Sequence, residues 1–278
     1  MEPPRVILTC FAGRKRYLEI LLKYSEYLHK HGHIHEVHLW DFTRATEDTE
    51  WLKTSPTITS SPYISVKNVR NKHSWLEYYR HYTQSAYPAH VIIKCDDDVV
   101  FIDVKTFPEF IQRTVEEDTF LLRFPSIINN GVCAHYQQKW GLIPNTLDTF
   151  PYDTCCGKLW ASGALCQKLH EYFLDNHETW LETTRALPNK TCKHPLGNRI
   201  SINFFAVCSK NLNLYQIVGS DDEKDLSITL SRRLKKEHAV DTNFTVSHFA
   251  FHSQREKMDE PMLLEKYTAL ATNLENTE

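Results

Sequence analysis

The stretch VIIKCDDDVVFI, residues 91–102, places three adjacent carboxylates between two apolar runs. The β-branched and aromatic flanks predict buried strands, so the acidic turn lies at the end of the strand that precedes it. Adjacent like charges repel one another, and burying them without a partner is costly. A bound cation explains Asp96, Asp97 and Asp98 most simply, although a solvated acidic turn would show the same letters.

The segments before this stretch follow the order of an α/β fold. A strand is expected at 5–10, a helix with apolar residues at helical spacing at 17–30, and a second strand at 35–40. This β-α-β opening predicts a parallel sheet with helices on its faces. Further elements expected in the first half are a loop with one helical turn at 44–62, a strand at 63–66, helices at 74–85 and 107–117, and strands at 89–95 and 119–124.

The second half has a weaker pattern. Its many aromatic, Asn and Pro residues predict strands joined by long loops over 125–160. Apolar periodicity occurs at 163–176 and 200–208, with strands expected at 212–218 and 246–252 and helices at 221–237 and 261–273. There is no internal repeat or convincing linker, so we expect one α/β domain with a Rossmann-like, mixed and mostly parallel sheet flanked by helices.

Composition excludes several classes of protein. A net charge of -3 argues against a nucleic-acid binder, which would carry a basic stripe. No apolar run reaches the roughly 20 residues of a membrane span, and the N-terminus lacks the pattern of a signal peptide, so we expect a cytoplasmic protein. The eight cysteines show no CxxC spacing, which disfavours structural zinc and fits reduced thiols.

A second turn, at residues 11–14, follows the first expected strand. Ligands of open α/β sheets bind beyond the carboxyl ends of the strands, so this turn and the acidic turn would face one crevice if their strands are neighbours. A nucleotide diphosphate bridged to Mn²⁺ or Mg²⁺ suits such a crevice, because these cations are usually held by one or two carboxylates plus substrate phosphates.

Several blocks of the sequence, in order, resemble the GT-A glycosyltransferases. KCDDDVVFI resembles their Asp-x-Asp motif, and the stretch leading into it resembles the β3-galactosyltransferase and Fringe families. The blocks are VKNVRNK with Trp75 (66–75), KCDDDVVFI (94–102), WASGAL (160–165), KDLSIT (224–229) and FHSQ (251–254). With the expected first strand they span roughly residues 5–255.

The length and the lack of an anchor also resemble the glycosyltransferases that large chloroviruses encode to decorate capsid glycans, among them a β-xylosyltransferase. These resemblances imply a single GT-A domain, with residues 1–124 binding the nucleotide sugar and 125–278 binding the acceptor. They further imply metal-dependent, inverting transfer from a UDP-sugar to a glycan hydroxyl. UDP-xylose is one candidate donor through the resemblance alone, and no residue determines the sugar. A virus-encoded enzyme of this kind would act in the host cytoplasm.

The resemblance also assigns roles to residues. Asp98 and His252 would bind the metal directly, and Asp96 would contact the donor ribose or a metal-bound water. Asp225 would be the catalytic base. The nucleotide pocket would comprise Thr9, Ala12, Arg14, Asn71, Lys72, Asp96 and Asp97, and the acceptor site Tyr152, Trp160, Ser162 and Gly163.

Some of these roles have competing explanations. Lys224 stands where the family usually has an acidic residue or Pro-Asp, and Asp221 and Asp222 lie close by, so the identity of the base stays open. Asp225 could also simply complement a helix dipole. His248 and His252 are four residues apart, about 13 Å along a strand, which favours one ligand over two.

Other candidate residues could be purely structural. Tyr152 and Trp160 could stack on a sugar or belong to the core, and Arg14 could pair with phosphate or simply be exposed. One alternative function is a metal-dependent hydrolase or nucleotidyltransferase, which would require further metal ligands. The other is a non-catalytic carbohydrate-binding protein of the same fold.

Overall fold

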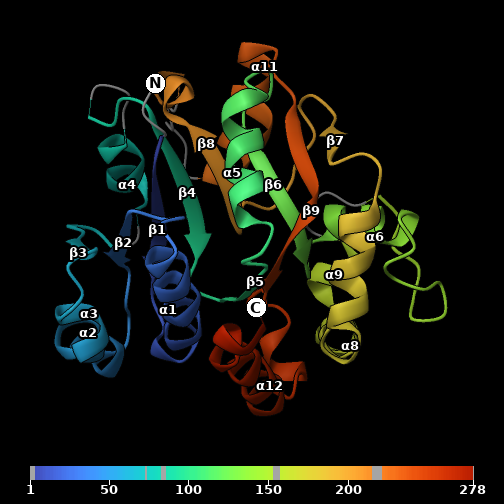
Figure 1. Cartoon of the computed structure of the whole chain (residues 1–278), viewed down its shortest axis with the longest axis horizontal. Coiled ribbons are helices and arrows are strands. Elements are labelled where there is room, and N and C mark those ends of the chain that lie inside the picture. Colours follow the sequence, from blue (N-terminus) through green and yellow to red (C-terminus); the bar gives the residue numbers. More distant parts are fainter. Residues whose placement is uncertain (1–3, 73, 83–85, 153–156, 215–220, 278) are drawn as a thin grey trace.

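One mixed sheet runs through the molecule and is flanked by helices (Figure 1). The computed structural model describes residues 4–72, 74–82, 86–152, 157–214 and 221–277. Within them, the strands are β1 (Arg5–Ala12), β2 (Glu36–Asp41), β3 (Ile64–Asn68), β4 (His90–Asp96), β5 (Val99–Ile102), β6 (Arg123–Ile128), β7 (Thr191–His194), β8 (Phe204–Cys208) and β9 (His238–His248). They are ordered β3-β2-β1-β4-β8-β6-β9-β5, with β7 paired to β9.

Parallel pairing joins β3, β2, β1 and β4, and also joins β6 to β9. Antiparallel pairs join β8 to β4 and β6, and β9 to β5 and β7. The prediction of a mixed α/β sheet flanked by helices is therefore confirmed. The parallel part corresponds to the β-α-β opening, whose strands read as apolar runs because they are covered on both faces.

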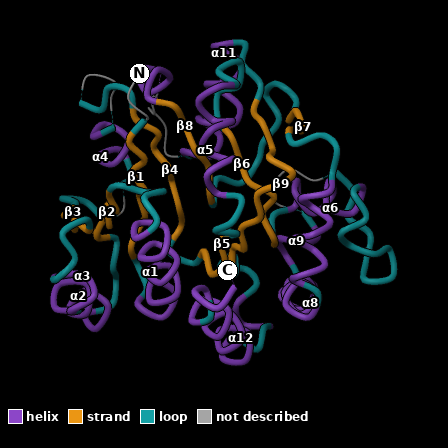
Figure 2. The backbone as a smooth tube through the Cα atoms, in the orientation of Figure 1, coloured by secondary structure: helices purple, strands orange, loops and turns teal. Residues whose placement is uncertain are grey.

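Helices pack around this sheet, as the backbone tube in Figure 2 shows. The α-helices are α1 (Lys15–Lys30), α2 (Thr46–Thr54), α3 (Pro56–Thr59), α4 (Leu76–His81), α5 (Phe107–Glu116), α6 (Gly131–Lys139), α7 (Lys158–Ala161), α8 (Gly163–Asp175), α9 (His177–Ala186), α10 (Asp222–Lys224), α11 (Ser231–Leu234) and α12 (Glu260–Thr272). A π-helical segment, Asp225–Leu230, joins α10 to α11, and 3₁₀ turns lie at Ser209–Leu214, Arg255–Lys257 and Leu274–Thr277. None of the helices described is long and apolar enough to cross a membrane.

The second half departs from the sequence-based expectation in three places. Residues 125–160 were expected to form strands joined by loops, but after β6 the chain forms α6, whose first turn is capped by the Asn130 side chain accepting from the Cys133 amide. The strand expected at 246–252 is β9, which starts eight residues earlier and ends at His248. Of the strand expected at 212–218, residues 212–214 belong to a 3₁₀ turn and the rest lies outside the described residues.

The sequence did not predict the first part of β9, because polar residues interrupt its apolar pattern. Asp241 interrupts the apolar pattern, yet it is fully buried, because Arg113 of α5 donates to both its oxygens at 2.7 and 3.0 Å. Arg123 of β6 adds a longer contact at 3.4 Å, and the amides of Asn243 and Phe244 each donate to Oδ1 at 3.1 Å. Asp241 thus joins one helix to two strands through charge rather than through apolar packing.

Buried histidines make the stability of the fold depend on pH. Burial lowers the pKa of His170 and of His238 to about 4, although hydrogen bonds to the carbonyls of Phe249 and Ser227 oppose the shift. In the unfolded chain a histidine has a pKa near 6.5. The unfolded state therefore binds more protons between about pH 6.5 and 4, and the free energy of unfolding falls as the pH is lowered through that window.

We expect each of these histidines to remove roughly 2 kcal/mol of stability between pH 7 and pH 5. Urea unfolding of the wild type and of His170→Gln at both pH values measures this loss. The variant should lose less stability than the wild type over the same interval. Equal losses in the two proteins would show that His170 is not kept neutral by burial.

Candidate functional site

The acidic turn lies beside the turn that follows β1. Strands β1 and β4 are parallel neighbours, with Phe11 opposite Asp96 at their carboxyl ends. Asp97 and Asp98 continue from Asp96 into the turn before β5, while Gly13 and Arg14 continue from β1 into α1. The two turns therefore meet at one edge of the sheet, which is where a parallel sheet places ligands.

Asp97 joins these two turns. Its Oδ2 accepts from the Gly13 amide at 3.1 Å and from Arg14 Nε at 3.0 Å, and its Oδ1 accepts from Arg14 Nη2. A Cβ at position 13 would lie 3.0 Å from Asp97 Oδ2, so glycine permits this close approach. Burial raises the pKa of Asp97 to about 6, with Arg14 opposing the shift. The geometry gives Asp97 a role in positioning the turns.

Asp98 is almost completely buried and has three basic neighbours. Its Oδ2 lies 2.9 Å from Arg14 Nη2 and 3.3 Å from Arg255 Nη2. Its Oδ1 lies 3.4 Å from Nε2 of His248, the last residue of β9. Burial alone would raise the pKa of Asp98, but His248 and the two arginines together hold it below its ordinary value. Asp98 is thus an anion at the point where four segments meet.

Asp96 is half-buried and faces the same point. Its Oδ1 pairs with the ammonium of Lys94, which is itself buried and donates to the Ile202 carbonyl at 2.7 Å. Its Oδ2 accepts from Asn203 Nδ2 at 3.2 Å. The pKa of Lys94 is raised, because the nearby carboxylates outweigh the burial that would lower it. Lys94 therefore stays charged inside the sheet.

Asp96, Asp98 and His248 form a candidate metal centre. Each offers one ligand atom, and the three atoms lie within 4.8 Å of one another. Burial lowers the pKa of His248, so its ring is neutral, the form that binds a metal. Two carboxylate oxygens and one imidazole nitrogen suit Mn²⁺, so these residues fit the cation that the sequence resemblance implies.

His252, the expected metal ligand, lies elsewhere in the site. It is exposed, and its ring meets the Trp160 ring edge-on, with centroids 5.3 Å apart. It lines the pocket above the metal centre but is not one of the three clustered ligands. Because β9 ends at His248, that histidine is the one placed directly beside Asp98.

Two pockets adjoin the acidic turn. One, of about 360 Å³, lies over the metal centre and is also lined by Asn203, Glu223 and His252. The other, of about 650 Å³, extends toward the ends of β1 and β2. They share Phe11, Arg14, Asp97, His252 and Arg255.

The structure places only some of the expected nucleotide-binding residues at the pockets. Arg14 and Lys72 line the larger pocket, where the Lys72 ammonium donates to Asp41 Oδ1 at 2.8 Å. Thr9 and Ala12 are fully buried, and Thr9 donates to the Ile93 carbonyl at 2.7 Å. Asn71 is exposed and is not among the described residues that line either pocket.

The candidate bases occupy the start of the helical segment after residue 220. Asp221 caps α10 by accepting from the Lys224 amide at 2.9 Å. Asp222 accepts from the Tyr79 hydroxyl at 2.7 Å, and burial raises its pKa. Asp225 begins the π-helical segment and is not among the described residues lining the pocket over the metal centre. Glu223, which the motif did not suggest, does line that pocket, with Oε1 accepting from Arg199 Nε at 2.6 Å.

The expected acceptor residues lie in two places. Trp160, in α7, reaches the pocket rim through its contact with His252. Ser162 caps α8 by accepting from the Leu165 amide at 3.2 Å, and a Cβ at Gly163 would lie 2.2 Å from the Gln254 carbonyl oxygen. Tyr152 is exposed, and its hydroxyl meets His194 Nδ1 at 3.1 Å.

The sequence blocks did not include every residue of the site. Three residues that they missed are Asn203, Arg255 and Glu223. Arg255 directly follows the FHSQ block and Glu223 directly precedes the KDLSIT block, so widening each block by one residue would have included both. Asn203 precedes the apolar run of β8 and gives no comparable signal, because it reaches Asp96 only through the pairing of β8 with β4.

Comparisons with known proteins support the fold. No protein-family model and no curated protein sequence matches the chain. The crystal structure of GalNAc-T7 with UDP, GalNAc and Mn²⁺ is similar, with a TM-score of 0.53 and 11% identity, and the match covers 90% of this chain. The chain spans only 45% of the GalNAc-T7 chain. A CMP-2-keto-3-deoxy-manno-octonic acid synthetase complexed with CTP matches over 98% of this chain and 99% of its own, at a TM-score of 0.47 and 9% identity. The likeness to GalNAc-T7 shows that this chain has a GT-A-like fold.

Proposed function

We propose that this protein is a metal-dependent glycosyltransferase that moves a sugar from a UDP-sugar to a glycan hydroxyl. The observation that carries the proposal is the Asp96–Asp98–His248 cluster, which lines the smaller of two adjoining pockets in a GT-A-like fold. Mn²⁺ held there would neutralise negative charge on the leaving diphosphate. The side chains around the cluster would bind the nucleotide and take the proton of the acceptor hydroxyl.

The larger pocket has the shape and charge to hold the nucleotide. It is lined by the Phe11, Phe42 and Trp75 rings, on which a base could stack, and by the basic groups of Arg44 and Lys72. Arg14 and Arg255 line both pockets, so they would contact the diphosphate where it passes from one to the other. Most of this lining comes from residues 1–124, which supports the proposal that this part of the chain binds the nucleotide.

The transferred sugar would then lie in the pocket over the metal centre, next to Glu223. The acceptor hydroxyl must lose its proton as it attacks, so a carboxylate must lie within hydrogen-bond reach of it. Asp225 is the base that the resemblance suggests, and Asp222 is the alternative close by in the sequence. Glu223 is the carboxylate that already lines this pocket. One displacement of this kind inverts the anomeric centre.

The test is calorimetric titration with UDP, first with Mn²⁺ and then with EDTA, followed by a panel of UDP-sugars that includes UDP-xylose. The proposal expects UDP to bind only when Mn²⁺ is present and one sugar nucleotide to bind most tightly. Binding of CTP in preference to UDP would favour a nucleotidyltransferase instead. Failure of every nucleotide to bind would contradict the proposal.

Substitutions should identify the base. We expect Glu223→Gln to keep the UDP-sugar affinity near that of the wild type and to slow turnover by roughly 10²–10⁴-fold, the usual contribution of a general base. Asp222→Asn and Asp225→Asn are the matched comparisons. Hydrolysis of the UDP-sugar, followed as UDP release, provides the readout before an acceptor is known. A normal rate for Glu223→Gln with a slow Asp225→Asn would assign the base to Asp225.

A further inference from the structure

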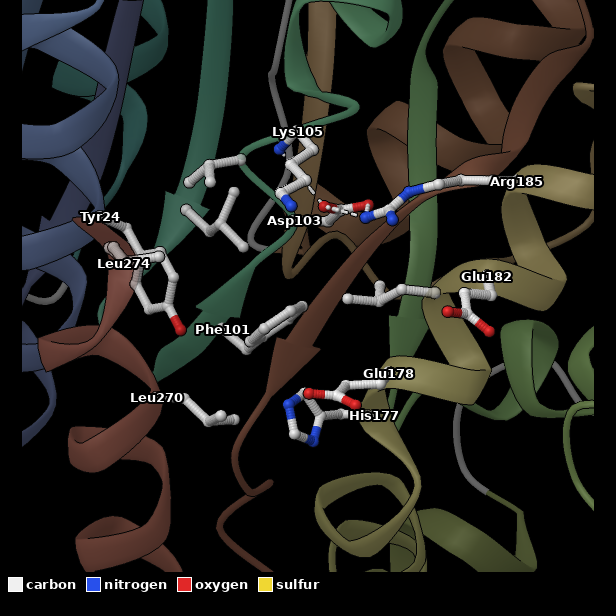
Figure 3. A pocket seen from close by; sticks show the side chains of 13 residues that line it. Tyr24, Phe101, Asp103, Lys105, His177, Glu178, Glu182, Arg185, Leu270 and Leu274 are labelled. Carbon is white, nitrogen blue, oxygen red and sulfur yellow. Dashed lines mark hydrogen bonds and ion pairs between the residues drawn. The ribbon is translucent and has the colours of Figure 1, made fainter. Parts of the chain in front are cut away.

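A third pocket, of about 440 Å³, lies at the other end of β5 from the acidic turn (Figure 3). It is enclosed by residues of α1, β5, the turn after β5, α9 and the C-terminal segment from α12 onward. None of its lining residues belongs to the two pockets of the candidate active site. Its volume is within the range of small-molecule sites.

The inner part of this pocket is apolar except for one hydroxyl. Phe101, Leu270 and Leu274 provide the walls, and the Tyr24 ring meets the Phe101 ring edge-on, with centroids 5.8 Å apart. Tyr24 is fully buried, and its hydroxyl has no hydrogen-bond partner among the residues that the structure describes. Figure 3 shows this hydroxyl directed toward the space between Phe101 and Leu270. Buried hydroxyls normally have a partner, so this one points to a ligand atom that can hydrogen-bond with it.

The first half of α9 turns two carboxylates toward the pocket. Glu178 and Glu182 are exposed, lie one helical turn apart, and form no ion pair with any residue in the described part of the chain. Like charges at this spacing destabilise a helix slightly unless a cation lies near them. His177 Nδ1 lies 3.1 Å from the Leu174 carbonyl, which can only accept, so this nitrogen donates to it.

The basic groups lie at the end of the pocket formed by the last turn of α9 and the turn after β5. Arg185 Nη2 lies 3.2 Å from Asp103 Oδ1, so its charge is largely compensated. Lys105 extends from the turn after β5 and is exposed. Three carboxylates and two basic side chains line the pocket, which gives it a net negative charge. A ligand with a positive group toward Glu178 and Glu182 therefore fits this charge distribution better than an anion does.

We propose that this pocket binds an amphipathic organic amine, with its ammonium between Glu178 and Glu182 and its apolar body against Phe101, Leu270 and Leu274. A polar atom at the far end of the ligand pairs with the Tyr24 hydroxyl. Leu270 and Leu274 are only half-buried and can move to admit that end. The proposal concerns a site separate from the proposed transferase centre and does not depend on it.

The test uses three probes of similar size: tyramine, phenethylamine and 3-phenylpropionate. Titration of the full chain, followed by calorimetry, should show that both amines bind and that the carboxylate does not. Tyramine should bind more tightly than phenethylamine, because its phenol reaches Tyr24. Tighter binding of 3-phenylpropionate, or no binding by any probe, would overturn the proposal.

Variants test whether the amines bind in this pocket. The double variant Glu178→Gln/Glu182→Gln should weaken amine binding at least tenfold, whereas Glu265→Gln, an exposed change on α12 outside the pocket lining, should leave it unchanged. Tyr24→Phe should abolish the advantage of tyramine over phenethylamine without reducing stability, because the hydroxyl it removes makes no hydrogen bond. Equal amine binding by the wild type and the double variant would show that the amine binds elsewhere.

Discussion

Asp98→Asn is expected to abolish Mn²⁺-dependent binding of UDP, with a loss of affinity of at least about 100-fold. The substitution keeps the size of the side chain but removes the negative charge on which three basic groups converge. Removing a residue that only supports a metal ligand typically costs 10–100-fold in metal affinity, so loss of a ligand itself should cost at least as much. Mn²⁺ binding in the presence of UDP, followed by electron paramagnetic resonance, measures the effect without requiring turnover.

The control for this experiment is Asp175→Asn, an exposed carboxylate whose partner is Lys266 at 3.3 Å. It should bind Mn²⁺ and UDP as the wild type does. His248→Ala should resemble Asp98→Asn, and His252→Ala should reveal whether the exposed histidine contributes to the metal site. Mn²⁺ binding by Asp98→Asn at the wild-type affinity would refute the assignment of Asp98 as a ligand.

Asp241→Ala is expected to destabilise the fold more than any substitution at the surface. The change leaves Arg113 and the buried Arg123 without their shared carboxylate, and leaves two backbone amides without an acceptor. Breaking a buried pair from one side costs about 3–5 kcal/mol. For a chain of this size that corresponds to a fall in Tm on the order of 10 °C.

Thermal unfolding followed by circular dichroism measures this effect. Asp175→Ala removes a carboxylate from an exposed pair and should change Tm little, because exposed ion pairs contribute little to stability. A small shift for Asp241→Ala would mean that water or other groups compensate the two arginines.

The sequence predicted the acidic turn and its neighbour well because both follow apolar runs in the parallel part of the sheet. There the apolar pattern alone identifies β1 and β4, and parallel strands bring their carboxyl ends together without further information. The same reasoning failed at β9. Its polar residues are buried because Arg113 and Arg123 reach them from α5 and β6, and those contacts join residues far apart in the chain.

The candidate metal centre also depends on contacts between distant segments that the sequence does not reveal. Their own segment suggests Asp96 and Asp98 as candidate ligands, but the choice between His248 and His252 as the candidate histidine depends on where β9 ends. Motif similarity favoured His252, whereas the extension of the strand places His248 beside Asp98. Likewise, Asn203 reaches the site only through the pairing of β8 with β4.

The charges at the acidic turn have a consequence for the order in which ligands bind. Asp96, Asp97 and Asp98 are matched in this structure by Lys94, Arg14 and Arg255, so the cluster is already neutral. A divalent cation arriving alone would give the cluster an excess of positive charge, and so would bind weakly. A diphosphate would draw Arg14 and Arg255 away from the carboxylates and expose them to the cation. Metal and nucleotide should therefore bind synergistically, each raising the affinity for the other by the same factor.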